Sequence, residues 1–168
     1  YEVREITAPY GMVLNGEIHI AELVYAGQNI SVTETAASFF NERQRVEIGL
    51  VKVLEKNEIF NIGTNGEMKN ISFGLVAAEE IVSASGTSIP ADGLIEIITL
   101  NEDGTAKTKT DLPIGSYYVK ELATDEHYIL SDTKYPVNFE YAGQDTATVK
   151  IDANNGKTIE NDLIYGSV

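Results

Sequence analysis

The sequence predicts an all-β protein whose one complete domain is a β-sandwich. Short runs rich in β-branched and aromatic residues recur along the chain, and turn residues separate them roughly every 8–12 residues. The composition is typical of a folded protein with a core, because 43% of the residues are hydrophobic and 23% are charged. An internal repeat then divides the 168 residues into one complete unit and one partial unit.

The repeat keeps one register over most of its length. Its offset is 141 − 25 = 116 residues, and a short insertion shifts only the last matching pair. The matching segments are residues 1–5 with 117–121, 13–14 with 129–130, 25–28 with 141–144, and 40–41 with 160–161. We therefore expect residues 1–44 to be the second half of a repeat whose first half is missing. Residues 45–168 are expected to form one complete domain, and the parent protein to be a string of such domains.

The first strand of the complete unit is expected over residues 46–54. Its alternate side chains point to one face, and that face carries Val46, Ile48, Leu50, Lys52 and Leu54. Four of these five residues are aliphatic, which marks the core face and places a lysine within an apolar stripe. The next expected elements are a polar loop over 56–70, a strand over 71–77, a short helical turn over 77–82 and a turn over 83–87.

The remaining elements are expected to be strands and turns. Residues 94–100 form a β-branched run, and residues 101–104 (Asn-Glu-Asp-Gly) are a hairpin turn signal. Residues 105–110 alternate lysine and threonine, as a solvated edge strand would. The last expected elements are a turn over 112–115 and strands over 117–121, 135–141, 146–151 and 158–165.

The charge balance excludes some partners. Lys and Arg number 12 against 26 Asp and Glu, which gives a net charge of −14 and a pI near 4.4. Such an acidic chain argues against binding to nucleic acid or to an anionic membrane surface. No apolar run approaches transmembrane length, so no membrane insertion is expected.

The sequence also offers little for a metal, a cofactor or a turnover enzyme. It has no cysteine, and therefore no disulfide, thiol nucleophile or cysteine-bound metal. His19 and His127 stand alone and are expected at the surface. The turn at 101–104 lacks the ligand alternation of a calcium-binding EF-hand loop. No nucleophile elbow or phosphate loop is found, so we expect no cofactor and no multiple-turnover enzyme.

Three strands each place one polar residue on their apolar side. Lys52 lies in the first strand, Glu121 in the middle one and Asn161 in the last. Each has an ordinary interpretation alone: a lysine whose ammonium reaches solvent, a glutamate at the rim, and an asparagine that bonds backbone groups. Together they indicate a buried site, because a buried charge or amide needs a partner.

The chemistry open to this trio is specific. In an apolar site a lysine tends to lose its proton and become a nucleophile, while a carboxyl tends to stay protonated. The acid can polarise the Asn161 carboxamide and move protons to the leaving amine. The product is an amide between Lys52 Nζ and Asn161 Cγ, with loss of ammonia. Such a cross-link would do for a cysteine-free domain what a disulfide does elsewhere.

These residues carry a resemblance to a known family. A strand ending in Lys52-Val53, a Gly-x-Tyr-x-Val-x-Glu segment over residues 115–121 and a last strand with Asn161 resemble the CnaB-type (SpaA-like) domains of Gram-positive surface proteins and pilins. The resemblance implies a prealbumin-like or reverse Ig-like β-sandwich with an autocatalytic Lys–Asn isopeptide bond. By this match Lys52 is the nucleophile, Glu121 the proton shuttle and Asn161 the electrophile.

The resemblance also implies a place and a role. The expected role is an adhesin or pilus-like stalk domain at the bacterial cell surface or cell wall, outside the cell. The expected partners are neighbouring domains of the same protein, with a host surface or matrix protein as a further candidate. The chain has no pilin-polymerising lysine motif, which favours a wall-anchored stalk over a backbone pilin. A ligand-binding adhesive module is the alternative function.

The sequence departs from the family pattern in two places. The family's Ala-Pro-x-Gly-Tyr segment is found loosely at residues 8–11 but is replaced at residues 124–128, a change expected to affect only a surface loop. The stretch between Lys52 and Phe73 is also long for the family, which makes Lys56 a rival nucleophile. Lys56 is the weaker candidate because it follows the end of the strand.

The incomplete first repeat has part of the same trio. By the match, Glu5 and Asn41 occupy the acid and amide positions, but the first 44 residues contain no lysine. A half sandwich exposes unpaired strand edges and an apolar face. It could pack on the complete domain or be a truncation product. Strands captured from another chain would instead make it one part of a split domain.

Overall fold

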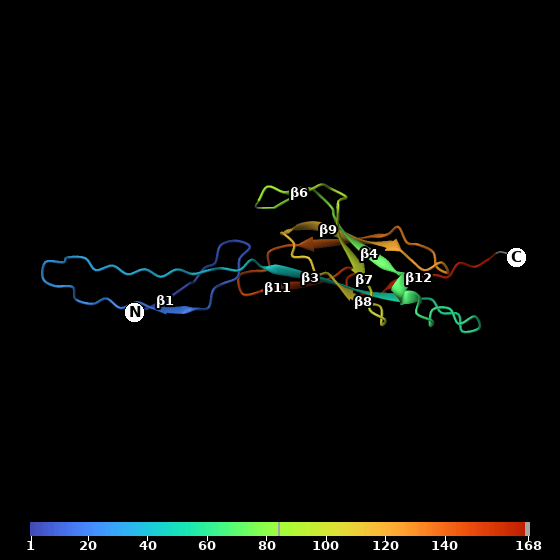
Figure 1. The fold of residues 1–168 in the computed structure, drawn as a ribbon, viewed down its shortest axis with the longest axis horizontal. Helices are drawn as coiled ribbons and strands as arrows, with labels where there is room; N and C mark the ends of the chain where they lie inside the picture. Colours follow the sequence, from blue (N-terminus) through green and yellow to red (C-terminus); the bar gives the residue numbers. More distant parts are fainter. Residues whose placement is uncertain (84, 167–168) are drawn as a thin grey trace. The chain divides into compact units, whose positions relative to one another are not determined.

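The computed structural model describes residues 1–83 and 85–166, and nearly all of its regular structure is β (Figure 1). The only helix in these ranges is a four-residue 3-10 helix, η1 (Glu67–Asn70). The contacts divide the chain into two units, which are described separately. The first unit is Tyr1–Gln44 with Tyr141–Ala147, and the second unit is Arg45–Glu140 with the residues from Thr148 onward.

The second unit contains two four-stranded sheets. One sheet has the order β10-β9-β4-β7, and the other has the order β11-β3-β12 with β8 also paired to β3. The strands of the first sheet are β4 (Ser72–Ala77), β7 (Leu94–Thr99), β9 (Gly115–Ala123) and β10 (Lys134–Phe139). Those of the second are β3 (Arg45–Leu54), β8 (Thr105–Lys107), β11 (Thr148–Asp152) and β12 (Ile159–Asn161). The predicted all-β fold is therefore confirmed.

Side chains from both sheets form one core. In β3 the residues Val46, Ile48, Leu50, Lys52 and Leu54 are all buried, so the predicted core face of this strand is confirmed. Across from them lie buried residues of the other sheet, including Phe73, Leu75, Tyr117, Val119 and Val137. This packing of two inward faces gives the sandwich its stability, because burying an aliphatic or aromatic side chain contributes about 1.5–3 kcal/mol.

The strand β3 is the centre of its sheet. Both β11 and β12 pair with it in parallel, one along its first half and one along its end, while β8 pairs antiparallel on the other side. The turn predicted at 101–104 is present, with a hydrogen bond of 2.9 Å from Gly104 N–H to Asn101 O. It does not form the predicted hairpin, because it joins β7 of one sheet to β8 of the other. Because β8 pairs only with β3, it is an edge strand as the alternating sequence predicted.

The structure corrects three expected elements. The helical turn predicted over 77–82 is wrong: Ala77 ends β4, and Ile81–Val82 is strand β5, paired with β6 (Ser88–Ile89). The predicted turn over 83–87 is present as the link between them, with a bond from Ser83 N–H to Thr87 O, although residue 84 lies outside the described residues. The strands predicted over 105–110 and 158–165 are shorter, at three residues each.

The first unit contains one two-stranded sheet. Its two strands, β1 (Glu2–Arg4) and β2 (Ile18–Ile20), are antiparallel, with Val3 opposite His19. At the repeat offset of 116 this is the register of β9 and β10, where Val119 lies opposite Tyr135. Most large apolar side chains of this unit are exposed, among them Ile6, Ile20, Val24, Tyr25, Val32 and Phe40.

Backbone hydrogen bonds repeat between the units as well. The bonds Val13 N–H to Glu42 O and Gln44 N–H to Gly11 O in the first unit correspond to Ile129 N–H to Asp162 O and Ile164 N–H to His127 O in the second. The corresponding residues are those that the sequence repeat aligns. The first unit therefore repeats part of the backbone hydrogen bonding of the second unit.

No helix in the described ranges combines the length and the apolarity that crossing a bilayer requires.

Candidate cross-linking site

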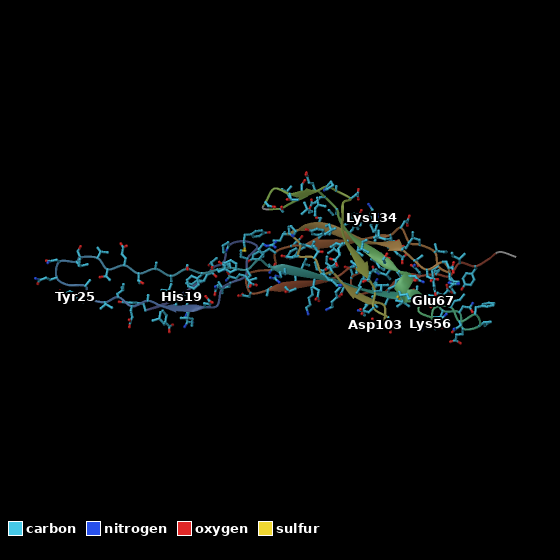
Figure 2. All side chains as sticks on the ribbon, viewed as in Figure 1. His19, Tyr25, Lys56, Glu67, Asp103 and Lys134 are labelled. Carbon is cyan, nitrogen blue, oxygen red and sulfur yellow. The ribbon has the colours of Figure 1, made fainter. Side chains whose placement is uncertain are left out.

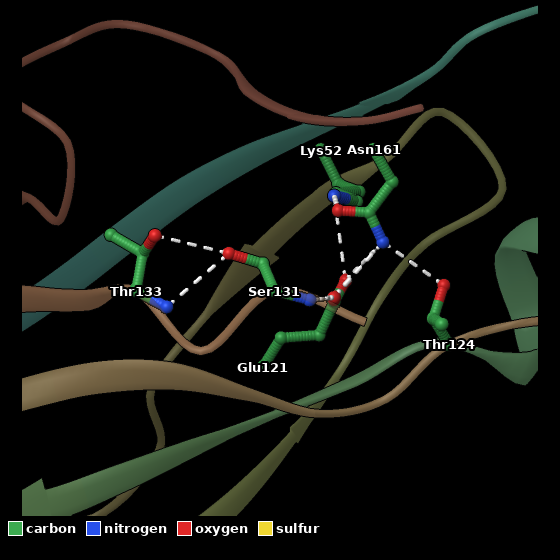
Figure 3. A network of polar contacts seen from close by, with 6 residues as sticks. All are labelled: Lys52, Glu121, Thr124, Ser131, Thr133 and Asn161. Carbon is green, nitrogen blue, oxygen red and sulfur yellow. Dashed lines mark hydrogen bonds and ion pairs between the residues drawn. The ribbon is translucent and has the colours of Figure 1, made fainter. Parts of the chain in front are cut away.

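Three strands bring Lys52, Glu121 and Asn161 together in the core of the second unit (Figure 3). Lys52 and Asn161 come from adjacent parallel strands, because β12 pairs with the end of β3 and places Ile159 opposite Lys52. Glu121 comes from β9 in the other sheet, where it lies opposite Phe73 of β4. The site is thus built across the sandwich.

The three side chains are in direct contact. Lys52 Nζ donates to Asn161 Oδ1 over 2.5 Å and lies 3.4 Å from Glu121 Oε1. Asn161 Nδ2 donates to both carboxylate oxygens of Glu121, each at 2.9 Å. The side chains of Lys52 and Glu121 are both 0% exposed, so the expected buried cluster is present.

Burial makes the Lys52 ammonium group easier to deprotonate than an exposed one. Loss of hydration lowers the pKa of Lys52 below its ordinary value, and the attraction of Glu121 opposes this effect without cancelling it. The Phe73 ring adds little, since its centroid is 5.9 Å from Nζ, near the limit for a cation–π contact. The neutral amine, which is the nucleophilic form, is therefore more accessible here than in an exposed lysine.

The backbone around Lys52 is fixed by the turn before β8. Lys52 N–H donates to Gly104 O at 2.8 Å. Gly104 has a φ of +82°, and a Cβ at this position would lie 2.1 Å from the carbonyl oxygen of Lys52. Only glycine allows this approach, because a side chain would meet backbone atoms as well as an unfavourable φ. The turn signal read from the sequence thus also supports the site.

Two further residues hold the acid and the amide. The backbone N–H of Ser131 donates to Glu121 Oε2 at 3.0 Å, and Asn161 Nδ2 donates to Thr124 Oγ1 at 3.0 Å (Figure 3). The sequence interpretation missed both. It also treated residues 124–128 as a surface loop, which is wrong for Thr124 and for the buried Asp125 and Tyr128. The sequence did contain one feature that could have indicated Thr124: the aligned residue of the first repeat is Ala8, which has no hydroxyl.

The rival nucleophile Lys56 lies outside this cluster. Its side chain is exposed on the loop after β3 (Figure 2). The long stretch after β3, which made Lys56 a rival to Lys52, forms a locally folded loop. Glu67, at the start of η1, is buried and accepts the N–H groups of Gly63 and Asn65 at 3.0 and 2.7 Å. The loop therefore has a structural explanation that leaves Lys52 as the lysine in the site.

The first unit contains the acid–amide part of the same arrangement. Asn41 Nδ2 donates to Glu5 Oε2 at 2.7 Å, and the N–H of Asn15 donates to the same oxygen at 2.7 Å. Asn15 aligns with Ser131 at the repeat offset, so the acid is held in the same way in both units. The first unit has no lysine. The predicted pair Glu5–Asn41 is therefore in contact, but the unit has no lysine that could act as the nucleophile.

The histidines lie outside the cluster. His127 is exposed and contacts Asp125, with Nδ1 2.6 Å from Oδ1, and His19 lies 3.5 Å from Glu17. Among the described residues, no group of three or more His, Cys, Asp and Glu side chains is arranged to hold a metal ion.

Comparison with known proteins identifies the family. Residues 55–161 match the family described as the SpaA prealbumin-like fold domain. The chain belongs to this family. No curated protein matches the sequence. The resemblance to SpaA-like domains and the prealbumin-like fold are therefore confirmed.

Comparison of this SpaA-type chain with solved structures finds a fold similarity to the Bacillus anthracis TIE protein and lower-scoring similarities to two pilins. The Bacillus anthracis TIE protein is 20% identical with a TM-score of 0.57, over 98% of this chain and 25% of that one. The minor pilin GBS52 of Streptococcus agalactiae is 19% identical with a TM-score of 0.44, over 74% and 47%. The major pilin SpaA of Corynebacterium diphtheriae is 18% identical with a TM-score of 0.38, over 70% and 30%. The chain spans a quarter to a half of these proteins.

Proposed function

We propose that this SpaA-type chain is a stalk domain of a Gram-positive cell-surface protein, of adhesin or pilus-like type, stabilised by an isopeptide bond between Lys52 and Asn161. The observation that carries the proposal is the buried contact of lysine, glutamate and asparagine side chains, with Lys52 Nζ 2.5 Å from the Asn161 carboxamide. The proposed location is the outside of the cell wall. The proposed partners are neighbouring domains of the same protein and a host surface or matrix protein.

The reaction needs only the three side chains. Lys52 gives its extra proton to Glu121, 3.4 Å away, which leaves a neutral amine and a neutral acid. Nζ then attacks Cγ of Asn161, and the charge that develops is on Oδ1. Glu121 gives its proton to Nδ2, which leaves as ammonia, and takes one proton back from Nζ. One amide bond replaces another, and Glu121 returns to a carboxylate when it passes the extra proton to the departing ammonia, which leaves as ammonium. Lys52 and Asn161 are consumed, so the reaction occurs once per chain.

The cross-link would stabilise the domain by restricting its unfolded state. It joins residues that are 109 apart in sequence and ties β3 to β12. By analogy with a disulfide that closes a loop of about 100 residues, the expected gain is about 5 kcal/mol in the free energy of unfolding. A stalk under mechanical load and without cysteines benefits from such a link.

The test is the intact mass of the denatured chain. The expected wild-type mass is lower than that of the sequence by one ammonia, and Glu121→Ala restores the full mass. Lys56→Ala is the matched control: it removes an exposed lysine near the same strand end and should leave the deficit in place. A full mass in the wild type would mean that the trio is an unreacted hydrogen-bonded cluster and that the proposed bond is wrong.

A second proposal concerns the division of the chain. Residues 1–44 are proposed to be the second half of one repeat and residues 45–168 a complete domain. The supporting observation is that the first unit repeats the strand register and the acid–amide contact of the second. The first unit would then become reactive when strands with a lysine complete it, either from the same polypeptide or, as a split domain, from another chain.

This proposal is tested by supplying the missing segment. Residue 116 precedes the position that aligns with Tyr1, so a copy of residues 45–116 placed before Tyr1 restores a full repeat. The extended chain should lose two molecules of ammonia, and Asn41→Ala should reduce the loss to one. If the extended chain loses only one molecule of ammonia with Asn41 intact, the first unit is not the second half of a cross-linking repeat.

A further inference from the structure

We propose that Thr124 is a positioning residue for the cross-linking reaction, and this inference rests on the Lys52–Asn161 bond proposed above. The Thr124 hydroxyl holds the leaving nitrogen of Asn161 beside Glu121, and so keeps the carboxamide turned toward Lys52. Thr124 forms no bond in the reaction. It acts through the orientation of Asn161.

The contacts of the carboxamide support this role. Asn161 Nδ2 has two hydrogens, and it has acceptors on two sides: the Glu121 carboxylate at 2.9 Å and Thr124 Oγ1 at 3.0 Å. Oδ1 accepts from Lys52 Nζ at 2.5 Å. Three side chains therefore restrain rotation about the Cβ–Cγ bond of Asn161. Without the hydroxyl, only the two reacting partners would hold the group (Figure 3).

The contact is useful throughout the reaction. Nδ2 begins as an amide nitrogen and leaves as ammonia, so it always carries a hydrogen that Thr124 Oγ1 can accept. Glu121 changes its protonation during the reaction, whereas the hydroxyl does not. Thr124 is thus the partner that keeps the same role from the ground state to the departure of ammonia.

The backbone at Thr124 is held firmly enough for this task. Thr124 follows directly after β9, and the turn behind it is closed by a bond of 3.0 Å from Tyr128 N–H to Asp125 O. The Asp125 carboxylate is buried and accepts from Asn70 Nδ2 at 2.6 Å. Tyr128 is also buried, and its hydroxyl donates to Glu55 O at 2.8 Å. These contacts therefore fix the turn that positions the Thr124 hydroxyl.

The first unit provides an internal comparison. The residue aligned with Thr124 is Ala8, which has no hydroxyl. There the second hydrogen bond of the asparagine goes elsewhere, from Asn41 Nδ2 to Val13 O at 2.9 Å. An acid–amide contact can thus form without a threonine. The hydroxyl is present in the unit that has its lysine, which is what a role in the reaction predicts.

The experiment compares three chains during refolding. Unreacted wild type, Thr124→Val and Thr124→Ser are recovered in denaturant and refolded, and the loss of ammonia is followed by intact mass. Valine keeps the shape of threonine without its hydroxyl, whereas serine keeps the hydroxyl and loses the methyl. We expect Thr124→Val to react roughly three- to tenfold more slowly, the effect of one hydrogen bond, and Thr124→Ser to react at nearly the wild-type rate.

The order of the variants separates positioning from packing. If Thr124 only filled space, serine would be the slower variant and valine would match the wild type. A Thr124→Val chain that reacts as fast as the wild type overturns the inference. A wild-type chain that loses no ammonia overturns the proposed cross-link instead, so the two failures are distinguishable. A Lys52→Met background, in which no bond can form, gives the effect of each Thr124 variant on the free energy of unfolding alone.

Discussion

Lys52 Nζ lies 2.5 Å from Asn161 Oδ1, although the two residues are 109 apart in the sequence. The parallel pairing of β12 with β3 produces this contact, because it places Ile159 opposite Lys52 and leaves Asn161 two residues further along on the same buried face. A one-residue shift of β12 would turn Asn161 to the solvent and replace it with an exposed neighbour, Glu160 or Asp162. The register of one short strand therefore decides whether the site exists.

The first prediction concerns the pH dependence of cross-linking. The nucleophile is the neutral amine, and burial lowers the pKa of Lys52 below its ordinary value. In the proposed reaction Lys52 and Glu121 share one proton, which Glu121 needs in order to protonate the leaving nitrogen. The rate should therefore be level while the pair holds this proton and fall as pH rises through the lowered pKa of Lys52, before the range where an exposed lysine loses its proton. Refolding of unreacted chain at a series of pH values, followed by intact mass, measures this. A rate that is still rising at the ordinary lysine pKa would contradict the prediction.

The second prediction concerns stability. Glu121→Gln should prevent the cross-link and lower the free energy of unfolding by about 5 kcal/mol, the value expected for opening a loop of about 100 residues. Glu160→Gln is the matched control, because Glu160 is exposed in β12 beside Asn161. It should change stability by less than about 0.5 kcal/mol. Denaturant unfolding of both variants, with their intact masses, would show whether the loss of stability accompanies the loss of the bond.

The third prediction concerns the turn that supports Lys52. Gly104→Ala should destabilise the second unit strongly, since its Cβ would lie 2.1 Å from Lys52 O and its φ is +82°. Gly86→Ala has the same φ of +82° but no atom within 4 Å of the added Cβ. It therefore measures the conformational cost alone, about 1 kcal/mol. Equal losses of unfolding free energy in the two variants would mean that the contact with Lys52 can relax.

The sequence predicted the strands of the sandwich and the trio because both depend on local patterns. The alternation in β3 identified its core face, and the repeat identified the acid and amide positions of both units. The prediction from sequence failed where tertiary contacts decide the structure. Residues 77–82 form strand β5 instead of a helical turn because they pair with β6. Thr124 was missed because its contact with Asn161 depends on a turn that pattern alone does not place.

The loop between β3 and β4 shows the same limit. Its polar composition predicted an irregular excursion, and its length made Lys56 a rival to Lys52. The structure instead closes it with an antiparallel bridge between Asn57 and Ile62 and with the buried carboxylate of Glu67. A buried glutamate that accepts backbone N–H groups satisfies donors that the loop would otherwise leave open. Sequence composition could not distinguish this carboxylate from the exposed acidic residues around it.

The last prediction concerns the turn that carries Thr124. The hydrogen bond between His127 and Asp125 raises the pKa of His127 above its ordinary value of 6.5, with smaller contributions in the same direction from the charges of Glu126 and Glu67. A group whose pKa is raised on folding stabilises the folded state fully below its unfolded pKa and loses this contribution as pH rises through its folded pKa. The unfolding free energy should therefore fall as pH rises from about 6.5, the unfolded pKa, through the raised pKa of His127 in the folded state.

This pH dependence can be assigned to one residue. His127→Gln should remove the decline above pH 6.5, because glutamine has no proton to lose. Asn70→Ala is the matched control, since it removes another hydrogen bond to Asp125 without removing a titrating group. It should lower stability at every pH and leave the decline in place. The lowered pKa of Asp125 acts in a separate window at low pH, so the two effects do not overlap. A decline that survives in His127→Gln would place its origin elsewhere in the chain.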